Sequence, residues 1–142
     1  MEEKYFQAGT DRRRAVTEDI RAFLDTLPEV LFAYLYGSFT REERFRDVDV
    51  AVYLKNPIPS PLQAELRLEA ELAERIEKYP VELRVLNQAP LSFRYRVIKE
   101  GIVLVIRDED FRCKFVESTL RDYFDFAPFR KAYLQETIGL GI

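Results

Sequence analysis

The stretch from Tyr36 to Leu54 reads YGSFTREERFRDVDVAVYL, and the fold of this chain is built around it. It starts at the end of an apolar run, Val30 to Tyr36, that predicts a buried strand. A Gly37-Ser38 pair and a charged turn follow. A second predicted strand, Asp47 to Leu54, then begins with two aspartates separated by one residue. The stretch therefore predicts two strands joined by a turn that can accept phosphate, beside carboxylates that can accept a cation.

The second strand has a period of two, which separates an apolar face from an acidic one. Asp47 and Asp49 lie side by side on the acidic face. Two carboxylates this close repel each other, so without a cation one of them would be driven toward protonation. The pair therefore indicates a metal site, whereas an edge strand with its polar face in water is the plain structural alternative. The residues predicted to face the core are Val48, Val50, Val52 and Leu54.

The Gly37-Ser38 pair lies where a strand ends and a helix can begin. Glycine lets the backbone approach a phosphate closely, and Ser38 can cap the helix and donate its hydroxyl. A helix start also presents free N–H groups and the positive end of the helix dipole. An ordinary capped turn explains the pair equally well when it is taken alone. The aspartates that follow make the phosphate interpretation specific.

The absence of histidine removes several chemistries from consideration. Serine–histidine catalysis, HExxH zinc chemistry and histidine-based ribonuclease chemistry are all excluded. The single Cys113 excludes an internal disulfide and cannot build a zinc site. Acid–base and metal work therefore falls to Asp and Glu, which suit hard cations such as Mg²⁺.

Length and charge describe an ordinary globular protein. A chain of 142 residues predicts one domain with a real core. The net charge of −3 gives no reason to expect broad attraction to nucleic acid. No apolar run is long enough to span a membrane, and the N-terminus lacks a signal-peptide core. We therefore expect a cytoplasmic protein.

Alternating strands and helices predict an α/β (α+β) domain, in which a small mixed sheet is flanked by helices. The first helix is expected to be capped by Thr10 or Asp11, and a long C-terminal helix is expected to open at Asp108 and to be interrupted at Pro128, with fraying after Glu136. The expected helices and strands beyond the opening stretch are Thr10 to about Leu27, Leu62–Tyr79, Val81–Leu86, Leu91–Lys99 and Ile102–Ile106. The residues expected on the inner face of the second long helix are Leu62, Leu66, Ala70, Ala73 and Ile76.

The Gly-Ser pair, the turn and the Asp-x-Asp strand together resemble the signature of the DNA polymerase beta-type nucleotidyltransferase superfamily. The resemblance implies that Gly37 and Ser38 hold the triphosphate of ATP and that Asp47 and Asp49 bind Mg²⁺. It implies a third carboxylate on a neighbouring strand, and Glu82 in VELRVLN is the match, as a metal ligand or proton acceptor. An exposed strand residue is the alternative for Glu82.

Arg41 is a further residue that could contact phosphate, because a guanidinium makes charge-assisted hydrogen bonds. Its alternative is a surface position in a highly charged turn, and the sequence slightly favours that alternative.

The resemblance covers most of the chain and is strongest to the minimal nucleotidyltransferases, in which one small domain, here residues 1–142, is the whole protein. The chain is similar to the antitoxin members of that group, which are paired with HEPN-domain ribonuclease toxins. The family implication is a polymerase beta-like core with a long C-terminal helix that uses ATP and Mg²⁺ to transfer AMP onto a tyrosine of the toxin. No nucleic-acid or membrane partner is implied, and a homodimer stays open.

Two other functions remain open. The turn between Ser38 and Asp47 is shorter than the usual family version and carries Glu42 and Arg46 where smaller residues are common. Loss of catalysis through this turn would leave an antitoxin that neutralises its toxin by binding alone. The third interpretation is a transferase for a small-molecule hydroxyl, which the lack of room for an acceptor domain disfavours.

The C-terminal region concentrates aromatic residues, which are common anchors of protein interfaces. Phe111, Phe115 and Tyr123 have helical spacing and are expected to pack on the sheet. A docking surface for the partner is expected at Phe124, Phe126 and Phe129 around Pro128, with Tyr133 beyond them. The basic cluster Arg12-Arg13-Arg14 is expected to be a solvated helix turn.

Overall fold

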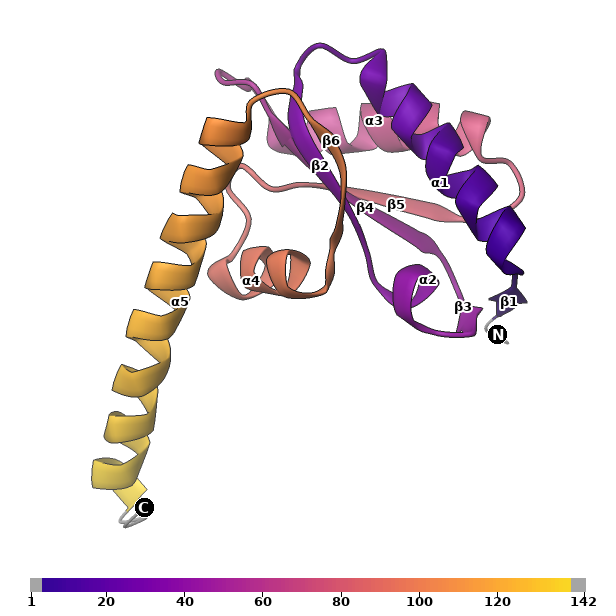
Figure 1. Cartoon of the computed structure of the whole chain (residues 1–142). Helices are drawn as coiled ribbons and strands as arrows, with labels where there is room; N and C mark the ends of the chain where they lie inside the picture. The colour runs from indigo at the N-terminus through magenta and orange to yellow at the C-terminus, as the bar shows by residue number, and fades with distance from the viewer. Residues whose placement is uncertain (1–3, 139–142) are drawn as a thin grey trace.

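The computed structural model describes residues 4–138, with side chains described through residue 125. Its centre is a four-stranded sheet with the strand order β5-β4-β2-β6 (Figure 1). The inner strand β2 is antiparallel to both of its neighbours, β4 and β6, whereas the edge strand β5 runs parallel to β4. The predicted mixed sheet is therefore confirmed, and each predicted strand is correct to within one residue. The strands are β2 (Val30–Tyr36), β4 (Val48–Leu54), β5 (Val81–Val85) and β6 (Ile102–Ile106).

Helices cover both faces of this sheet (Figure 1). One face packs against α1 and α3 through a large apolar cluster that includes Ile20 and Leu72. The other face packs against α4 and α5 through a smaller, aromatic cluster around Phe32 and Phe115. This arrangement confirms the predicted α/β fold with a long C-terminal helix. The helices are α1 (Thr10–Asp25), α3 (Pro61–Arg75), α4 (Leu91–Glu100) and α5 (Glu109–Ile138).

The alternation predicted for β4 is confirmed. Val48, Val50 and Val52 are completely buried in the cluster beneath α1 and α3. Asp49 therefore emerges on the opposite face, toward α4. The acidic face of the strand is the one that matters for the site.

The predicted inner face of α3 is wrong. Leu62 and Leu66 are 63% and 59% exposed, while Leu68 and Leu72 are fully buried. The physical reason lies at the outer edge of β5, whose main-chain N–H groups need acceptors. The Glu69 carboxylate accepts from Leu83 N at 2.9 Å and the Glu65 carboxylate from Val85 N at 3.0 Å, which fixes the rotation of the helix. Ala70 and Ala73 are likewise exposed, and Ile76 alone of the predicted set is buried.

The helix starts were predicted with mixed success. α5 opens as expected, because the Asp108 carboxylate accepts a hydrogen bond from Phe111 N at 2.9 Å. α1 does not use Thr10 or Asp11 as its cap, since Thr10 is already helical and Gly9 occupies the cap position without a side-chain hydrogen bond. Glycine is tolerated at this position because its extended backbone leaves the first N–H groups open to water.

The predicted interruption at Pro128 is also wrong, because α5 runs without a break from Glu109 to Ile138. A proline removes one main-chain hydrogen bond, and the helix continues on both sides of it. Residues beyond Ile138 lie outside the described part of the chain, and so do the side chains of Phe126, Phe129 and Tyr133. Within the described part, Phe124 is 56% exposed, and its role in docking stays a prediction.

Two short elements hold the turn between the central strands in place. α2 (Ser38–Arg41) follows β2, and β3 (Arg44–Phe45) pairs antiparallel with β1 (Phe6–Gln7) near the N-terminus. The ring of Phe45 is fully buried. The charged turn is therefore anchored to the core on the α1 side through Phe45, while its charged side chains stay exposed.

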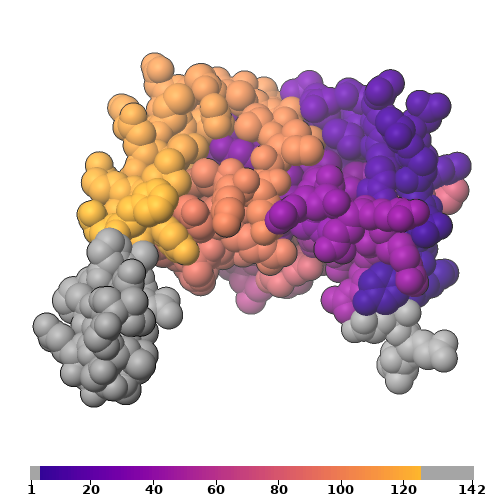
Figure 2. Space-filling view, turned by 60° about the horizontal axis from the view of Figure 1, so that its bottom comes forward, coloured from indigo at the N-terminus to yellow at the C-terminus, as the bar shows by residue number. Residues whose placement is uncertain are grey.

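The molecule is elongated because α1 and α5 lie at opposite ends (Figure 2). Among residues 4–138, no helix has the length and apolar character needed to cross a membrane.

Candidate active site

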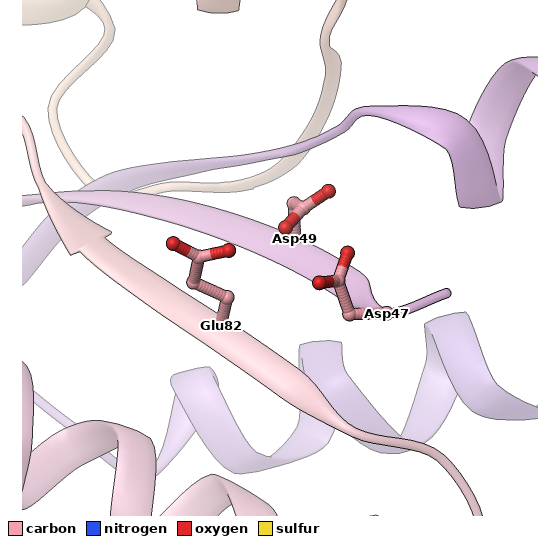
Figure 3. Close-up of side chains that lie close together, drawn as sticks. All are labelled: Asp47, Asp49 and Glu82. Carbon is pink, nitrogen blue, oxygen red and sulfur yellow. The ribbon is translucent and has the colours of Figure 1, made fainter. Parts of the chain in front are cut away.

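Three carboxylates converge across β4 and β5 (Figure 3). The strands are parallel and in a register that pairs Asp49 directly with Glu82, so the two side chains leave the sheet on the same face. Asp47, just before β4, points to the same place. One carboxylate oxygen from each of the three lies within 4.8 Å of the others. The structure therefore brings together all three of the acidic residues singled out in the sequence.

The electrostatics of this cluster favour a cation. Asp49 is only 8% exposed. Burial, followed by repulsion from Asp47 and Glu82, raises the pKa of Asp49 to about 7. A divalent cation would remove this repulsion, and oxygen ligands of this kind suit Mg²⁺. The donor set therefore fits the predicted metal.

Gly37 is required by the geometry of the turn. Its φ of 85° lies in the region that side-chain-bearing residues rarely adopt. A Cβ atom at this position would also lie 2.2 Å from Asp49 Oδ2. Only glycine lets the backbone turn this close to the carboxylate.

Ser38 lines the same cleft as the three carboxylates, which has a volume of about 770 Å³. It is the first residue of α2, directly after the glycine turn. The cleft thus has an acidic wall from β4 and β5 and a hydroxyl-bearing wall from the turn. Ser38 and the three carboxylates therefore share one cleft.

Arg41 is not part of this cleft. Its guanidinium forms an ion pair with Glu100 at 2.7 Å, in a neighbouring hollow over the end of α4. Glu100 also forms an ion pair with Arg96 at 3.3 Å. Arg41 therefore joins α2 to α4, in a hollow that Gly37 and Ser38 also line, and its contact with phosphate stays a prediction.

Sequence reasoning missed three residues of the cleft. Tyr36 pairs with Asp49 across β2 and β4, and burial followed by the charges of Asp49 and Glu82 raises its pKa. The Arg84 guanidinium forms an ion pair with Glu82 at 2.5 Å. The Arg96 guanidinium lies over the Tyr36 ring, 5.7 Å from its centroid. Alternation along VELRV places Arg84 on the same face as Glu82, so that signal was present in the sequence. Arg96 comes from a separate helix and carried no such signal.

Arg13 was also missed, because the sequence suggested only a solvated basic turn. Its guanidinium donates to the main-chain oxygens of Glu42 at 3.0 Å and Glu43 at 2.8 Å, and to that of Phe39. It also lies over the rings of Phe39 and Phe45 at 5.2 and 5.0 Å. Arg13 thus clamps the turn that carries Ser38 to α1.

A parallel strand pair with three clustered carboxylates, beside a glycine turn and a serine, is suited to metal-assisted nucleotidyl transfer. The family described as Polymerase beta, Nucleotidyltransferase matches residues 18–110 of this sequence. The chain belongs to this family, which identifies its class as a nucleotidyltransferase. The predicted resemblance is thereby confirmed.

Solved toxin–antitoxin complexes contain chains with the same fold. One is tri-AMPylated Shewanella oneidensis HEPN toxin in complex with MNT antitoxin, with a TM-score of 0.67, 21% identity, and coverage of 89% of this chain and 98% of that one. Another is a toxin–antitoxin with AMP-PNP, with a TM-score of 0.68, 24% identity, and coverage of 86% and 98%. A third is the toxin–antitoxin MntA-HepT, with a TM-score of 0.66, 21% identity, and coverage of 88% and 98%. No curated protein matches the sequence significantly.

Proposed function

We propose that this protein is an antitoxin that uses Mg²⁺ and ATP to transfer AMP onto a tyrosine of a partner HEPN ribonuclease toxin, which inactivates the toxin. The observation that carries the proposal is the convergence of Asp47, Asp49 and Glu82 beside Ser38 in one open cleft. The likeness in fold to chains of complexes with an AMPylated HEPN toxin and with AMP-PNP supports the nucleotide and the acceptor.

Each wall of the cleft has its own part in binding ATP. Mg²⁺ held by the three carboxylates would offset the charge that develops at the α-phosphate. The turn of Gly37 and Ser38 offers a hydroxyl to the outer phosphates, with no side chain at Gly37 in the way. Arg84 and Arg96 line the same cleft and can donate charge-assisted hydrogen bonds to phosphate oxygens.

The reaction is a displacement at phosphorus. The tyrosine hydroxyl oxygen of the acceptor forms a bond to the α-phosphorus, and the bond from that phosphorus to the oxygen bridging to the β-phosphate breaks. Pyrophosphate leaves, and the hydroxyl proton passes to the carboxylate of Glu82. The product is a tyrosine joined to AMP through a phosphodiester.

The acceptor tyrosine belongs to another protein in this proposal, so it must reach the cleft from outside the chain. We propose that the partner supplies this tyrosine, that residues 1–142 act as one domain, and that the reaction takes place in the cytoplasm, where ATP and Mg²⁺ are available.

The test uses the purified chain, ATP labelled at the α-phosphate, Mg²⁺ and the protein that co-purifies with the chain. We expect label on a tyrosine of the partner, located by tandem mass spectrometry. The double variant Asp47→Asn/Asp49→Asn should give no label, and the matched surface variant Arg14→Gln should label normally.

Two results would replace the proposal. A wild-type chain that neutralises its partner without labelling it would be an antitoxin that acts by binding alone. Label on a small hydroxyl compound in the absence of any co-purifying partner would make the chain a small-molecule transferase.

A further inference from the structure

A second cavity lies on the other side of the loop that bounds the catalytic cleft. It has a volume of about 600 Å³ and lies between the end of β4, α4 and α5. Gln88 and Ala89 line both this cavity and the catalytic cleft. We call it the side pocket, and its volume is in the range of small-ligand sites.

The side pocket gathers cations, whereas the catalytic cleft gathers carboxylates. Arg94 from α4 and Lys114 and Arg121 from α5 line it, with Glu117 as the single acidic residue. Three positive charges and one negative charge give a local charge of +2. A phosphate monoester carries a charge of about −1.5 to −2 at pH 7, so the charges match.

The ion pairs found among the described residues do not include Arg94, Lys114 or Arg121. Arg94 Nε is enclosed by protein without a hydrogen-bond acceptor. A buried donor left without an acceptor is costly, so a water molecule or a small shift of the Arg94 side chain toward a ligand oxygen would satisfy it. Most other arginines of the described chain have carboxylate, carbonyl or aromatic contacts: Arg13, Arg21, Arg41, Arg67, Arg84, Arg96, Arg107 and Arg112.

The remaining wall is aromatic. Tyr53, Phe111 and Phe115 line the pocket. The Tyr53 ring contacts the other two, with centroids 5.0 Å from Phe111 and 5.5 Å from Phe115. Aromatic walls favour flat rings such as nucleobases. Asn87 is already engaged, because its amide exchanges hydrogen bonds with the main chain of Leu54 at 2.9 and 2.7 Å, so Gln88 is the amide left for a base edge.

We propose that the side pocket is a second nucleotide site, which binds a nucleoside monophosphate without a metal. Arg94, Lys114 and Arg121 bind the phosphate, and the aromatic wall contacts the base. Within residues 4–125, the only metal-type acidic cluster is the one in the catalytic cleft, so phosphate binding in the side pocket is independent of Mg²⁺. The inference goes beyond the transfer reaction and does not require it.

The test measures AMP binding by calorimetry to the Asp47→Asn/Asp49→Asn variant in EDTA, where metal-dependent binding in the catalytic cleft is absent. We expect AMP to bind, and Arg94→Gln to weaken it about tenfold or more, since one charge-assisted contact is lost. Lys114→Gln, at an exposed position, should weaken it about threefold to tenfold without destabilising the fold. Arg14→Gln on α1 is the matched control and should leave the affinity unchanged.

Adenosine and inorganic phosphate are the companion probes, and each should bind at least tenfold more weakly than AMP. Equal binding of adenosine would overturn the role of the cations, and equal binding of phosphate would overturn the nucleotide assignment. The proposal also fails if AMP does not bind in EDTA, or if binding is insensitive to both Arg94→Gln and Lys114→Gln. None of these results bears on whether the wild-type chain transfers AMP in Mg²⁺, so the two proposals stand or fall separately.

Discussion

The two faces of the central sheet are built from the same strands and serve different ends. Toward α1 and α3, β4 presents Val48, Val50 and Val52, all completely buried. Toward α4, the same strand presents Asp49, whose burial and acidic neighbours raise its pKa to about 7. The apolar face stabilises the folded state. The acidic face holds carboxylates that repel one another unless a cation is bound between them. Stability and activity should therefore respond to different substitutions on one strand pair.

The largest effect is expected from Asp49→Asn. Removing a metal ligand and its charge should lower AMP transfer by about a thousandfold or more, because electrostatic stabilisation of the transition state is lost. The same change removes a buried repulsion, so the metal-free protein should unfold at a higher temperature. Kinetics with Mg²⁺ measure the loss of transfer, and thermal unfolding in EDTA measures the change in stability. A variant that loses activity and also loses stability would contradict this view of the acidic face.

The opposite pattern is expected for Leu72→Ala on the apolar face. Leu72 is fully buried, so truncation should lower the free energy of unfolding by about 3 kcal/mol. Transfer per folded molecule should be unchanged, because the side chain lies across the sheet from the cleft. Denaturant unfolding and active-fraction kinetics measure these quantities.

Leu66→Ala on the same helix is the control, because Leu66 is 59% exposed. It should change the free energy of unfolding by less than about 0.5 kcal/mol. Equal effects at Leu66 and Leu72 would mean that the rotation of α3 described above is wrong.

Sequence alone predicted the acidic face of β4 well and the buried face of α3 poorly, and the reason is physical. Alternation along a strand depends only on backbone geometry, so Asp47 and Asp49 could be placed without knowing the neighbours. The rotation of α3 depends on Glu65 and Glu69 reaching β5, a contact between residues far apart in the chain. Local apolar spacing pointed to Leu62 and Leu66 instead, which are exposed.

Residues that act across elements were beyond sequence reasoning for the same reason. Arg13 looked like one of three equivalent basic residues, yet it alone reaches the carbonyls of the Glu42–Glu43 turn. Glu82 could be proposed because the family pattern supplied its partner strand. Arg96 could not, since nothing local indicates that α4 folds over Tyr36.

Gly37→Ala should affect both faces at once, since Gly37 joins the turn to the acidic cluster. The positive φ and the 2.2 Å approach of the added Cβ to Asp49 Oδ2 must both be relieved by movement of the turn or of the carboxylate. We expect a loss of about 1–2 kcal/mol in the free energy of unfolding and a tenfold to hundredfold loss of transfer. Gly9→Ala is the control, because nothing lies within 4 Å of its added Cβ, and it should leave transfer unchanged.

A smaller effect on activity is expected for Arg13→Ala. Loss of the clamp should loosen the segment from Phe39 to Glu43, which directly follows Ser38 of the cleft. The KM for ATP should rise about threefold to tenfold with a smaller change in kcat, and main-chain hydrogen exchange of this segment should become faster. Arg14→Ala, one residue along and exposed, should change neither quantity. Slower transfer without faster exchange would argue against a positioning role.

The smallest effect is expected from pH, and its sign separates the two faces. The folded-state pKa of Asp49 is raised to about 7 from an ordinary value of 3.8, so the folded protein holds this proton more tightly than the unfolded chain. The resulting stabilisation is fully present below pH 3.8 and is lost as the pH rises to about 7. In EDTA, the Tm of the wild type relative to Asp49→Asn should fall by about 3–5 °C between pH 5 and pH 8, with Mg²⁺ restoring it at pH 8. Leu72→Ala should retain this pH dependence in full, because its loss of stability arises on the face without charges. If the Tm of the wild type instead rose relative to that of Asp49→Asn with increasing pH, the repulsion would not lie at Asp49.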